Sequence, residues 1–215
     1  MSDALPIASI RTQVTVPLQF PDGYATEARV FSFDGLVDGR EHLALGLGEW
    51  RAALDRQADE APLVRPHSEC LTGDVFGSQR CDCGPQLREG VERIADAGGF
   101  LLYLRQEGRG IGLYPKLDAY ALQDTGLDTY QANLALGHRA DERDYTTAAQ
   151  MLTALGAQRV RLLTNNPDKA EQLTRLGVSV VGCVPTGIYL SEANAGYLAA
   201  KASHHARPSD VPSAR

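Results

Sequence analysis

The sequence predicts an α/β (α+β) fold, with a single domain in which helices flank a mixed β-sheet. Short strand-like segments fill the first third of the chain, and helix and strand patterns alternate after it. This order is typical of one sheet covered by helices. The length of 215 residues suits one compact domain, or at most two small ones. We predict that domain over 11–206, a flexible N-terminus over 1–10 and a disordered, Pro/Ser-rich tail over 207–215.

The first third of the chain contains three predicted strands. Thr12–Leu18 alternates between apolar and polar residues, Glu27–Phe33 contains β-branched and aromatic residues, and His42–Leu47 is a short apolar run. Each pattern fits a strand of ordinary length. Gly48–Ala61 carries several charged residues, and we predict that it is a solvated connection.

Helical periodicity begins at Gly84. Leu87, Val91 and Ile94 recur at helical spacing, so they predict one apolar face of a helix that ends near Gly98. The other predicted strands are Phe100–Leu104, Val160–Leu163 and Val178–Val181, and the other predicted helices are Tyr114–Gln123, Tyr145–Leu155, Pro167–Leu176 and Glu192–Ala206. Asn166 followed by proline is the typical start of a helix.

Composition excludes several classes of protein. The net charge of −6 argues against nucleic acid or an anionic membrane as a partner. No apolar run approaches the roughly 20 residues that a transmembrane helix needs, and the N-terminus lacks the pattern of a signal peptide. We therefore expect a cytoplasmic protein without a disulfide framework, and local charge still allows an anionic small substrate.

Three of the four cysteines form a cluster along the chain. Cys70, Cys81 and Cys83 lie within fourteen positions. Three thiolates suit Zn²⁺ and leave one tetrahedral position open for water or substrate, as a catalytic zinc requires. Spacing alone leaves two alternatives open, which are a structural zinc completed by His67 or Cys183 and inert buried thiols.

A glycine- and arginine-rich segment is a candidate phosphate site. Arg105–Gly112 follows a predicted strand and precedes a predicted helix. Backbone N–H groups in such a loop and the guanidinium of Arg109 can bind an anion. The segment matches neither common nucleotide-binding fingerprint, and taken alone it can equally be a simple turn.

Two further segments carry candidate polar residues. Thr164–Lys169 follows a predicted strand, a position at which α/β sheets bind ligands, although it can also be an ordinary connection. Asp144 precedes a predicted helix and is expected to cap it. Asp141 and Arg143, beside it, are candidates for proton transfer and a phosphate contact, or for an ordinary acidic helix start.

Taken together, six segments in one order resemble the GTP cyclohydrolase II family, whose enzymes commit GTP to riboflavin synthesis. The resemblance covers Arg65 to Lys201 and rests on six stretches: Arg65–Asp74, Arg80–Gly84, Arg105–Leu113, Ala119–Asp124, Ala140–Tyr145 and Leu163–Pro167. It favours the catalytic zinc over the two alternatives.

The resemblance implies a division of roles among residues. One Zn²⁺ per subunit would be held by Cys70, Cys81 and Cys83, and the catalytic residues would be Asp141 as proton acceptor, Arg143 at the α-phosphate and Tyr120 in formyl hydrolysis. The GTP-binding residues would be Arg65, Pro66, His67, Ser68, Glu69, Gln86, Glu107, Gly108, Arg109, Thr129, Thr164 and Lys169. Mg²⁺ would accompany the triphosphate, and the protein would be a homodimer.

Three functions remain open on the sequence. The first is the complete reaction, in which GTP yields formate, pyrophosphate and 2,5-diamino-6-ribosylamino-4(3H)-pyrimidinone 5′-phosphate. The second is a paralogue that stops at the formamidopyrimidine nucleotide or serves secondary metabolism. The third is a GTP-binding regulator without catalysis. Tyr120 favours the first over the second, and Asp141 with Arg143 argues against the third.

Overall fold

The chain forms two compact units. The computed structural model describes residues 5–57 and 60–205. One unit, here called the sheet unit, comprises Met1–Glu69, Gln86–Arg105 and Asp144–Gly187, and the other, the cysteine unit, comprises Cys70–Pro85, Gln106–Arg143 and Ile188–Arg215. The tail predicted over 207–215 and the first four residues of the predicted flexible N-terminus lie outside the described residues.

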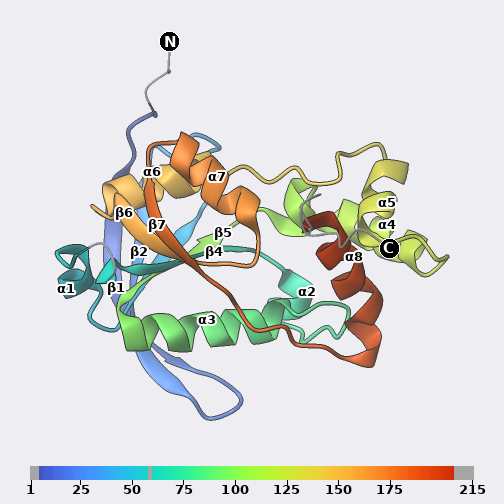
Figure 1. Ribbon diagram of the computed structural model, residues 1–215, viewed down its shortest axis with the longest axis horizontal. Coiled ribbons are helices and arrows are strands. Elements are labelled where there is room, and N and C mark those ends of the chain that lie inside the picture. Colours follow the sequence, from blue (N-terminus) through green and yellow to red (C-terminus); the bar gives the residue numbers. More distant parts are fainter. Residues whose placement is uncertain (1–4, 58–59, 206–215) are drawn as a thin grey trace, which may run out of the picture. The chain divides into compact units, whose positions relative to one another are not determined.

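The sheet unit is built on one mixed sheet of seven strands in the order β1-β2-β3-β5-β4-β6-β7 (Figure 1). Strands β1, β2, β3 and β5 pair antiparallel, and β5, β4, β6 and β7 pair parallel. Their bounds are Ser9–Gln19 (β1), Ala25–Asp34 (β2), Leu43–Leu47 (β3), Leu63–Ser68 (β4), Gly99–Leu104 (β5), Arg159–Leu163 (β6) and Ser179–Val184 (β7). The predicted fold class is confirmed.

Helices cover both faces of this sheet (Figure 1). Alternation along β5 places Phe100 and Leu102 in one apolar cluster with α6 (Thr146–Ala154) and α7 (Pro167–Arg175). Leu101 belongs to the opposite cluster, with Val91 and Ile94 of α3 (Cys83–Ala97). The apolar face predicted for that helix is therefore confirmed.

The predicted helix caps also have partners. Asn166 Oδ1 accepts the backbone N–H of Asp168 at 3.0 Å, with Pro167 at the first helical position. Asp144 Oδ1 accepts the N–H of Thr146 at 2.7 Å, although the residue directly before α6 is Tyr145, which makes no side-chain cap hydrogen bond.

The prediction of a solvated connection over Gly48–Ala61 is wrong in its middle. A short helix, α1 (Trp50–Leu54), lies there. The Trp50 ring packs edge-on against Phe31, with 5.3 Å between ring centroids, and lies 5.6 Å from Phe100. The aromatic ring of Trp50 thus helps to hold this segment on the sheet, together with Leu54, and five helical residues are too few to show periodicity.

Strand β4 has no counterpart among the predicted strands, because its sequence is unlike that of a buried strand. It carries Arg65, Pro66 and His67, and proline is rare inside sheets. Pro66 pairs with Leu102 of β5 in a parallel register, whereas the pairing of β4 with β6 involves only Leu63 and Val64. The proline thus lies beyond the stretch that β6 pairs, where the strand tolerates a missing N–H.

The cysteine unit consists of short helices held largely by polar contacts. Its elements besides the start of α3 are α2 (Leu71–Asp74), η2 (Glu107–Gly110), α4 (Leu113–Gln123), α5 (Thr129–Ala135), η3 (Glu192–Asn194) and α8 (Ala195–His205). Asp128 and Gln131 form a capping box at the start of α5. Among the described residues, both apolar clusters lie within the sheet unit.

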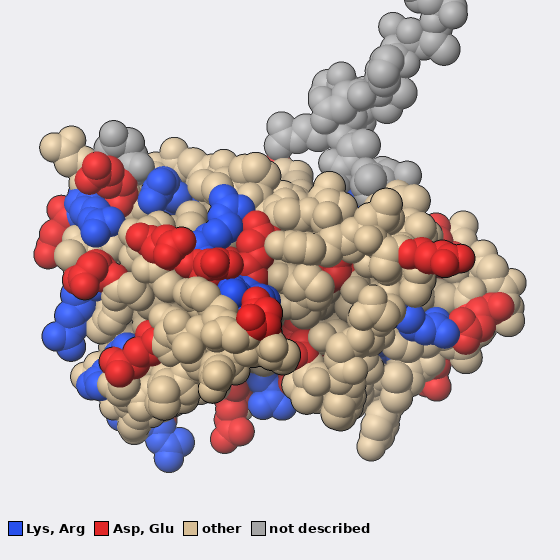
Figure 2. Space-filling model, turned by 90° about the horizontal axis from the view of Figure 1, so that it is seen from below, with Lys and Arg blue, Asp and Glu red and all other residues tan. Residues whose placement is uncertain are grey.

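Charged side chains of both signs are interspersed on the face shown in Figure 2. On α3, Arg88 pairs with Glu92 at 3.0 Å and Arg93 pairs with Glu89 at 2.8 Å, which is the ordinary spacing of ion pairs on a helix.

Within the described part of the chain, no helix is both long and apolar enough to cross a membrane.

Candidate active site

The three clustered cysteines meet in the cysteine unit. Cys70 precedes α2, and Cys83 is the first residue of α3. The Sγ atoms of Cys70, Cys81 and Cys83 all lie within 4.8 Å of one another, and Cys70 Sγ is 3.7 Å from Cys81 Sγ. The trio therefore forms a site that can hold a metal ion.

Gly73 makes room for these sulfurs. A Cβ atom at this position would lie 2.9 Å from Cys81 Sγ and 3.1 Å from Cys70 Sγ, so any larger residue would press on the cluster. Three thiolate donors around such a cradle fit Zn²⁺, which prefers sulfur and nitrogen ligands in a tetrahedron. Three protein ligands leave one position for substrate or water.

The three thiols influence one another's ionisation. The pKa of Cys70 lies far below its usual range, because Cys81 and Cys83 donate to its thiolate and the Lys116 ammonium lies beside it. Donation to that thiolate raises the pKa of Cys81 to about 11, and the pKa of Cys83 also lies well above its ordinary value. The negative charge of the Cys70 thiolate therefore opposes ionisation of Cys81 and Cys83 unless a cation binds to the group.

Glu107, a predicted GTP-binding residue, lies in a buried network beside Cys70. Its Oε1 accepts from Lys116 Nζ at 2.7 Å and from the N–H of Gly108 at 3.0 Å. Its Oε2 accepts the N–H of Leu71 at 2.7 Å. Both carboxylate oxygens are therefore engaged within the protein.

Tyr120 lies next to this network on α4. Its hydroxyl is 3.2 Å from Thr72 Oγ1, and the Arg80 guanidinium lies over its ring at 4.9 Å from the centroid. Burial raises the pKa of Tyr120, so the phenol remains protonated and able to donate a hydrogen bond.

Asp141 and Arg143 form a tight ion pair. Arg143 Nε donates to Asp141 Oδ1 at 2.9 Å and to Oδ2 at 3.1 Å, Nη2 also donates to Oδ2, and the backbone N–H of Arg143 reaches Oδ1. Burial alone would raise the pKa of Asp141, but the Arg143 contacts outweigh it and hold that pKa below its ordinary value. The pair is therefore carboxylate and guanidinium at neutral pH.

Arg109 has an unusual backbone and an aromatic partner. Its φ is 61°, in the left-handed region that non-glycine residues seldom adopt. Its guanidinium carbon lies 3.9 Å from the centroid of the Tyr130 ring, next to Thr129 at the start of α5. Its Nη1 is buried and has no hydrogen-bond partner among the described residues.

The sheet unit carries the other predicted GTP-binding residues. Arg65 is 5% exposed and its Nη2 donates to Gln86 Oε1 at 3.0 Å. A Cβ atom at Gly90 would come within 2.6 Å of Arg65 Cδ, so that glycine makes room for the arginine. The two side chains thus form one buried polar group.

The remaining predicted sheet-unit residues lie at or just after the ends of parallel strands, except Lys169, which lies in α7. Lys169 Nζ donates to the carbonyl of Pro66 at 2.8 Å, and His67 stacks on Tyr103. Thr164 Oγ1 accepts the N–H of Asn166 at 3.0 Å. Ser68 ends β4, and Glu69 after it accepts from Arg105 Nε at 2.9 Å.

Comparison with known proteins decides the family. The family model described as GTP cyclohydrolase II matches residues 12–185. The chain is 52% identical over 181 residues to the GTP cyclohydrolase-2 of Vibrio parahaemolyticus, covering 83% of this chain and 87% of that one. This chain belongs to the GTP cyclohydrolase II family.

Two other relatives agree with this assignment. The GTP cyclohydrolase-2 of Psychromonas ingrahamii is 46% identical over 201 residues, which cover 92% of this chain and 96% of that one. The riboflavin biosynthesis protein RibBA of Bacillus velezensis is 50% identical over 187 residues, which cover 86% of this chain and 46% of that longer protein. The match to the GTP cyclohydrolase II family model begins at residue 12 and so includes the N-terminal strands.

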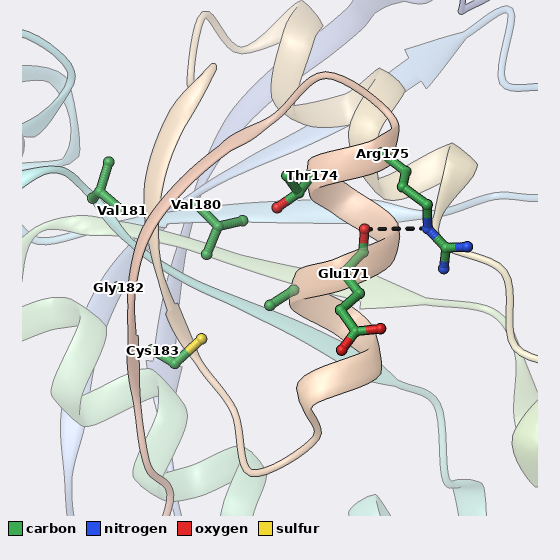
Figure 3. A pocket seen from close by; sticks show the side chains of 8 residues that line it. Glu171, Thr174, Arg175, Val180, Val181, Gly182 and Cys183 are labelled. Atoms are coloured by element: carbon green, nitrogen blue, oxygen red, sulfur yellow. Dashed lines mark hydrogen bonds between the residues drawn. The ribbon is translucent and has the colours of Figure 1, made fainter.

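The fourth cysteine lies elsewhere in the fold. Figure 3 shows a surface pocket of about 570 Å³ that is lined by residues of α7 and β7, Cys183 among them. No residue predicted for metal, GTP or catalysis lines this pocket. Within the described part of the chain, the group of residues that could hold a metal ion is Cys70, Cys81 and Cys83.

Lys116 and Tyr130 contact the predicted site residues although sequence patterns assign them no role. Lys116 is 9% exposed and shares the buried face of α4 with Ala119. Lys116 lies three positions before Ala119 on the inner face of the helix. This spacing is the sequence pattern that could have predicted that Lys116 is buried. For Tyr130 no comparable pattern exists, because its contact with Arg109 is between distant segments.

Proposed function

We propose that this chain hydrolyses GTP in a zinc-dependent reaction that opens the imidazole ring at C8 and releases formate and pyrophosphate. The product would be 2,5-diamino-6-ribosylamino-4(3H)-pyrimidinone 5′-phosphate, in the first step of riboflavin biosynthesis. The observation that carries this proposal is the meeting of three cysteine sulfurs within 4.8 Å in a chain of this family. Membership of the family supports GTP as the substrate.

The cysteine trio would hold one Zn²⁺ per subunit and leave one coordination position open. A zinc ion there would act as a Lewis acid and activate water for attack on the ring carbon. The inert-thiol alternative is less favourable, because it gives no reason for three sulfurs to converge around Gly73.

Asp141 would accept the proton that leaves during ring opening. The depressed pKa of its carboxyl keeps it ionised at neutral pH, as a proton acceptor must be before the step. Arg143 would then act as an electrostatic clamp at the α-phosphate when pyrophosphate leaves. Its guanidinium is charged and already paired with Asp141, which disfavours a role as nucleophile.

Tyr120 would donate a hydrogen bond to the oxygen that develops negative charge as the formyl group is hydrolysed. Its raised pKa supports the donor role. Among the proposed GTP-binding residues, Arg109 presents a free guanidinium nitrogen that suits a phosphate oxygen. Mg²⁺ would be held mainly by the triphosphate and water.

The other proposed GTP-binding residues follow the family resemblance. In the sheet unit they are Arg65, Pro66, His67, Ser68, Glu69, Gln86, Thr164 and Lys169, and in the cysteine unit Glu107, Gly108 and Thr129. Glu107 is assigned to the base or ribose rather than to phosphate because of its charge, although its oxygens already have protein partners. A homodimer is also expected from the resemblance.

One incubation separates the three candidate functions. The zinc-loaded protein is mixed with GTP and Mg²⁺, and formate, pyrophosphate and the product mass are measured together. Equal amounts of formate and pyrophosphate with the deformylated mass support the proposal. A formylated product without formate indicates the shortened reaction, and unchanged GTP in a protein that holds zinc indicates a binding protein and refutes catalysis.

A further inference from the structure

Lys116 lies at the centre of a buried group of acceptors beside Cys70. Its Nζ is 3.2 Å from Cys70 Sγ, 3.0 Å from Thr72 Oγ1 and 2.7 Å from Glu107 Oε1. An ammonium has three N–H donors, so each donor has one acceptor. A lysine this deeply buried has little solvent to satisfy it and is fixed mainly by these contacts.

Glu107 holds both Lys116 and the backbone that carries Cys70. One carboxylate oxygen receives Lys116, and the other receives the N–H of Leu71, the residue directly after Cys70. Charge-assisted hydrogen bonds of this kind are short and strong. The carboxylate therefore fixes the ammonium relative to the sulfur from two directions.

The glycine after Glu107 allows this close approach. A Cβ atom on Gly108 would lie 3.0 Å from Lys116 Cβ, and the residue has a φ of +61°. Both the space and the backbone conformation favour glycine. The turn η2 therefore passes close enough to α4 for Glu107 to reach the lysine.

From these contacts we propose that Lys116 is a positioning residue for the metal site, where its ammonium donates to the Cys70 thiolate and offsets the charge of the cluster. The proposal rests on the zinc site proposed above. Three thiolates and one divalent ion carry one excess negative charge in a buried place, and Lys116 supplies a positive charge next to it. Hydrogen bonds to metal ligands typically contribute about 10- to 100-fold in metal affinity.

The same lysine connects the metal ligand to Tyr120. Thr72 Oγ1 accepts from Lys116 and is 3.2 Å from the Tyr120 hydroxyl. Lys116 thereby orients a hydroxyl that contacts the proposed hydrogen-bond donor. Loss of the lysine would remove the N–H···S contact. Loss of the Thr72 hydroxyl would leave that contact in place but would remove its own contact with Cys70 Sγ at 3.8 Å as well as the one with Tyr120.

The test compares zinc affinity and the cobalt spectrum of full-length variants. Lys116→Met removes the charge and the donors, and Lys116→Gln removes the charge and holds its N–H donors one bond further from the sulfur. Zinc affinity, measured by competition with a chromophoric chelator, should fall about 10- to 100-fold in Lys116→Met and less in Lys116→Gln. In the cobalt-substituted protein the sulfur-to-metal charge-transfer band should move to longer wavelength, because the sulfur lone pair loses its N–H donor.

Lys201 provides a matched control. Its Nζ is 3.5 Å from Asp82, between the second and third cysteines in sequence, so it pairs with a carboxylate rather than with a sulfur. Lys201→Met should leave the cobalt band at the wild-type wavelength. If Lys116→Met or Lys116→Gln also keeps both band and affinity, the inference is overturned while the zinc site stands. A wild-type protein that binds no zinc would instead overturn the proposed function itself.

If Lys116→Met does not fold, Lys116→Gln carries the same test. Circular dichroism of the metal-free proteins distinguishes loss of folding from loss of metal. A folded Lys116→Gln variant with wild-type band position and affinity contradicts the proposal.

Discussion

Different forces stabilise the sheet unit and the cysteine unit. In the sheet unit, buried strands contribute to two apolar clusters, one on each face. In the cysteine unit, side-chain carboxylates bind backbone N–H groups, as Glu107 does at Leu71 and Asp128 does at Gln131. Apolar burial contributes most of the favourable free energy of folding, so the cysteine unit has more to gain from a bound metal.

The largest expected effect is that of removing the metal. Chelation, or Cys83→Ser, should abolish ring opening and speed backbone amide exchange in α2 and α4, while the amides of β5 and β6 keep their protection. The physical reason is that the cysteine unit lacks a large apolar cluster of its own among the described residues. Amide hydrogen exchange followed by mass spectrometry measures both units at once. Equal loss of amide protection in β5 and β6 would contradict the separate stabilisation of the two units.

The next effect concerns proton transfer. Asp141→Asn keeps the shape of the side chain and removes its charge, so ring opening should fall about 10²- to 10⁴-fold with zinc content unchanged. Steady-state kinetics and metal analysis check this. Glu142→Gln, at the adjacent carboxylate, is the control and should remain close to wild type. Comparable losses of ring-opening activity in both variants would contradict the role of Asp141 as the proton acceptor.

A core substitution in the sheet unit should act on stability alone. Leu102 is fully buried in β5, and Leu102→Ala should lower the free energy of unfolding by about 2–5 kcal/mol. Urea denaturation gives that value. Zinc affinity, measured below the unfolding transition, should match wild type, and a parallel loss of affinity would mean that the two units are not energetically separate.

The smallest expected effect is at the aromatic partner of Arg109. Tyr130→Leu removes the ring under the guanidinium. Tyr130 is 6% exposed, and a desolvated cation–π contact contributes about 2 kcal/mol. The KM for GTP should rise about 30-fold at most with little change in kcat. Tyr130→Phe keeps the ring and should behave as wild type. A KM that rises equally in both variants would point to the hydroxyl instead.

Regular burial is the part of the fold that can be predicted from the sequence. The strand at Phe100–Leu104 and the helix face of Val91 and Ile94 are confirmed, because periodic apolar residues report directly on a buried face. Strand β4 escapes prediction because Arg65 and Pro66 do not follow such a pattern. Their burial depends on partners elsewhere in the chain, as for Arg65 with Gln86.

The cysteines of the candidate site can be predicted, since residue type and spacing limit what a metal can use. The network around them cannot, because it joins segments that are distant in sequence. Cys70 and Lys116 are 46 positions apart, and Leu71 and Glu107 are 36 apart. No local pattern specifies that a lysine on α4 points at a sulfur, and only the folded chain brings the two together.

Formate release measured against bound zinc tests the proposed zinc-dependent reaction most directly. Metal-free protein is reconstituted with increasing zinc, and formate formed from GTP is measured at each step together with the metal content. Activity should rise in proportion to bound zinc and level off at one zinc per subunit. Full formate release from the metal-free protein, or none at full zinc occupancy, would contradict a zinc-dependent reaction at the cysteine trio.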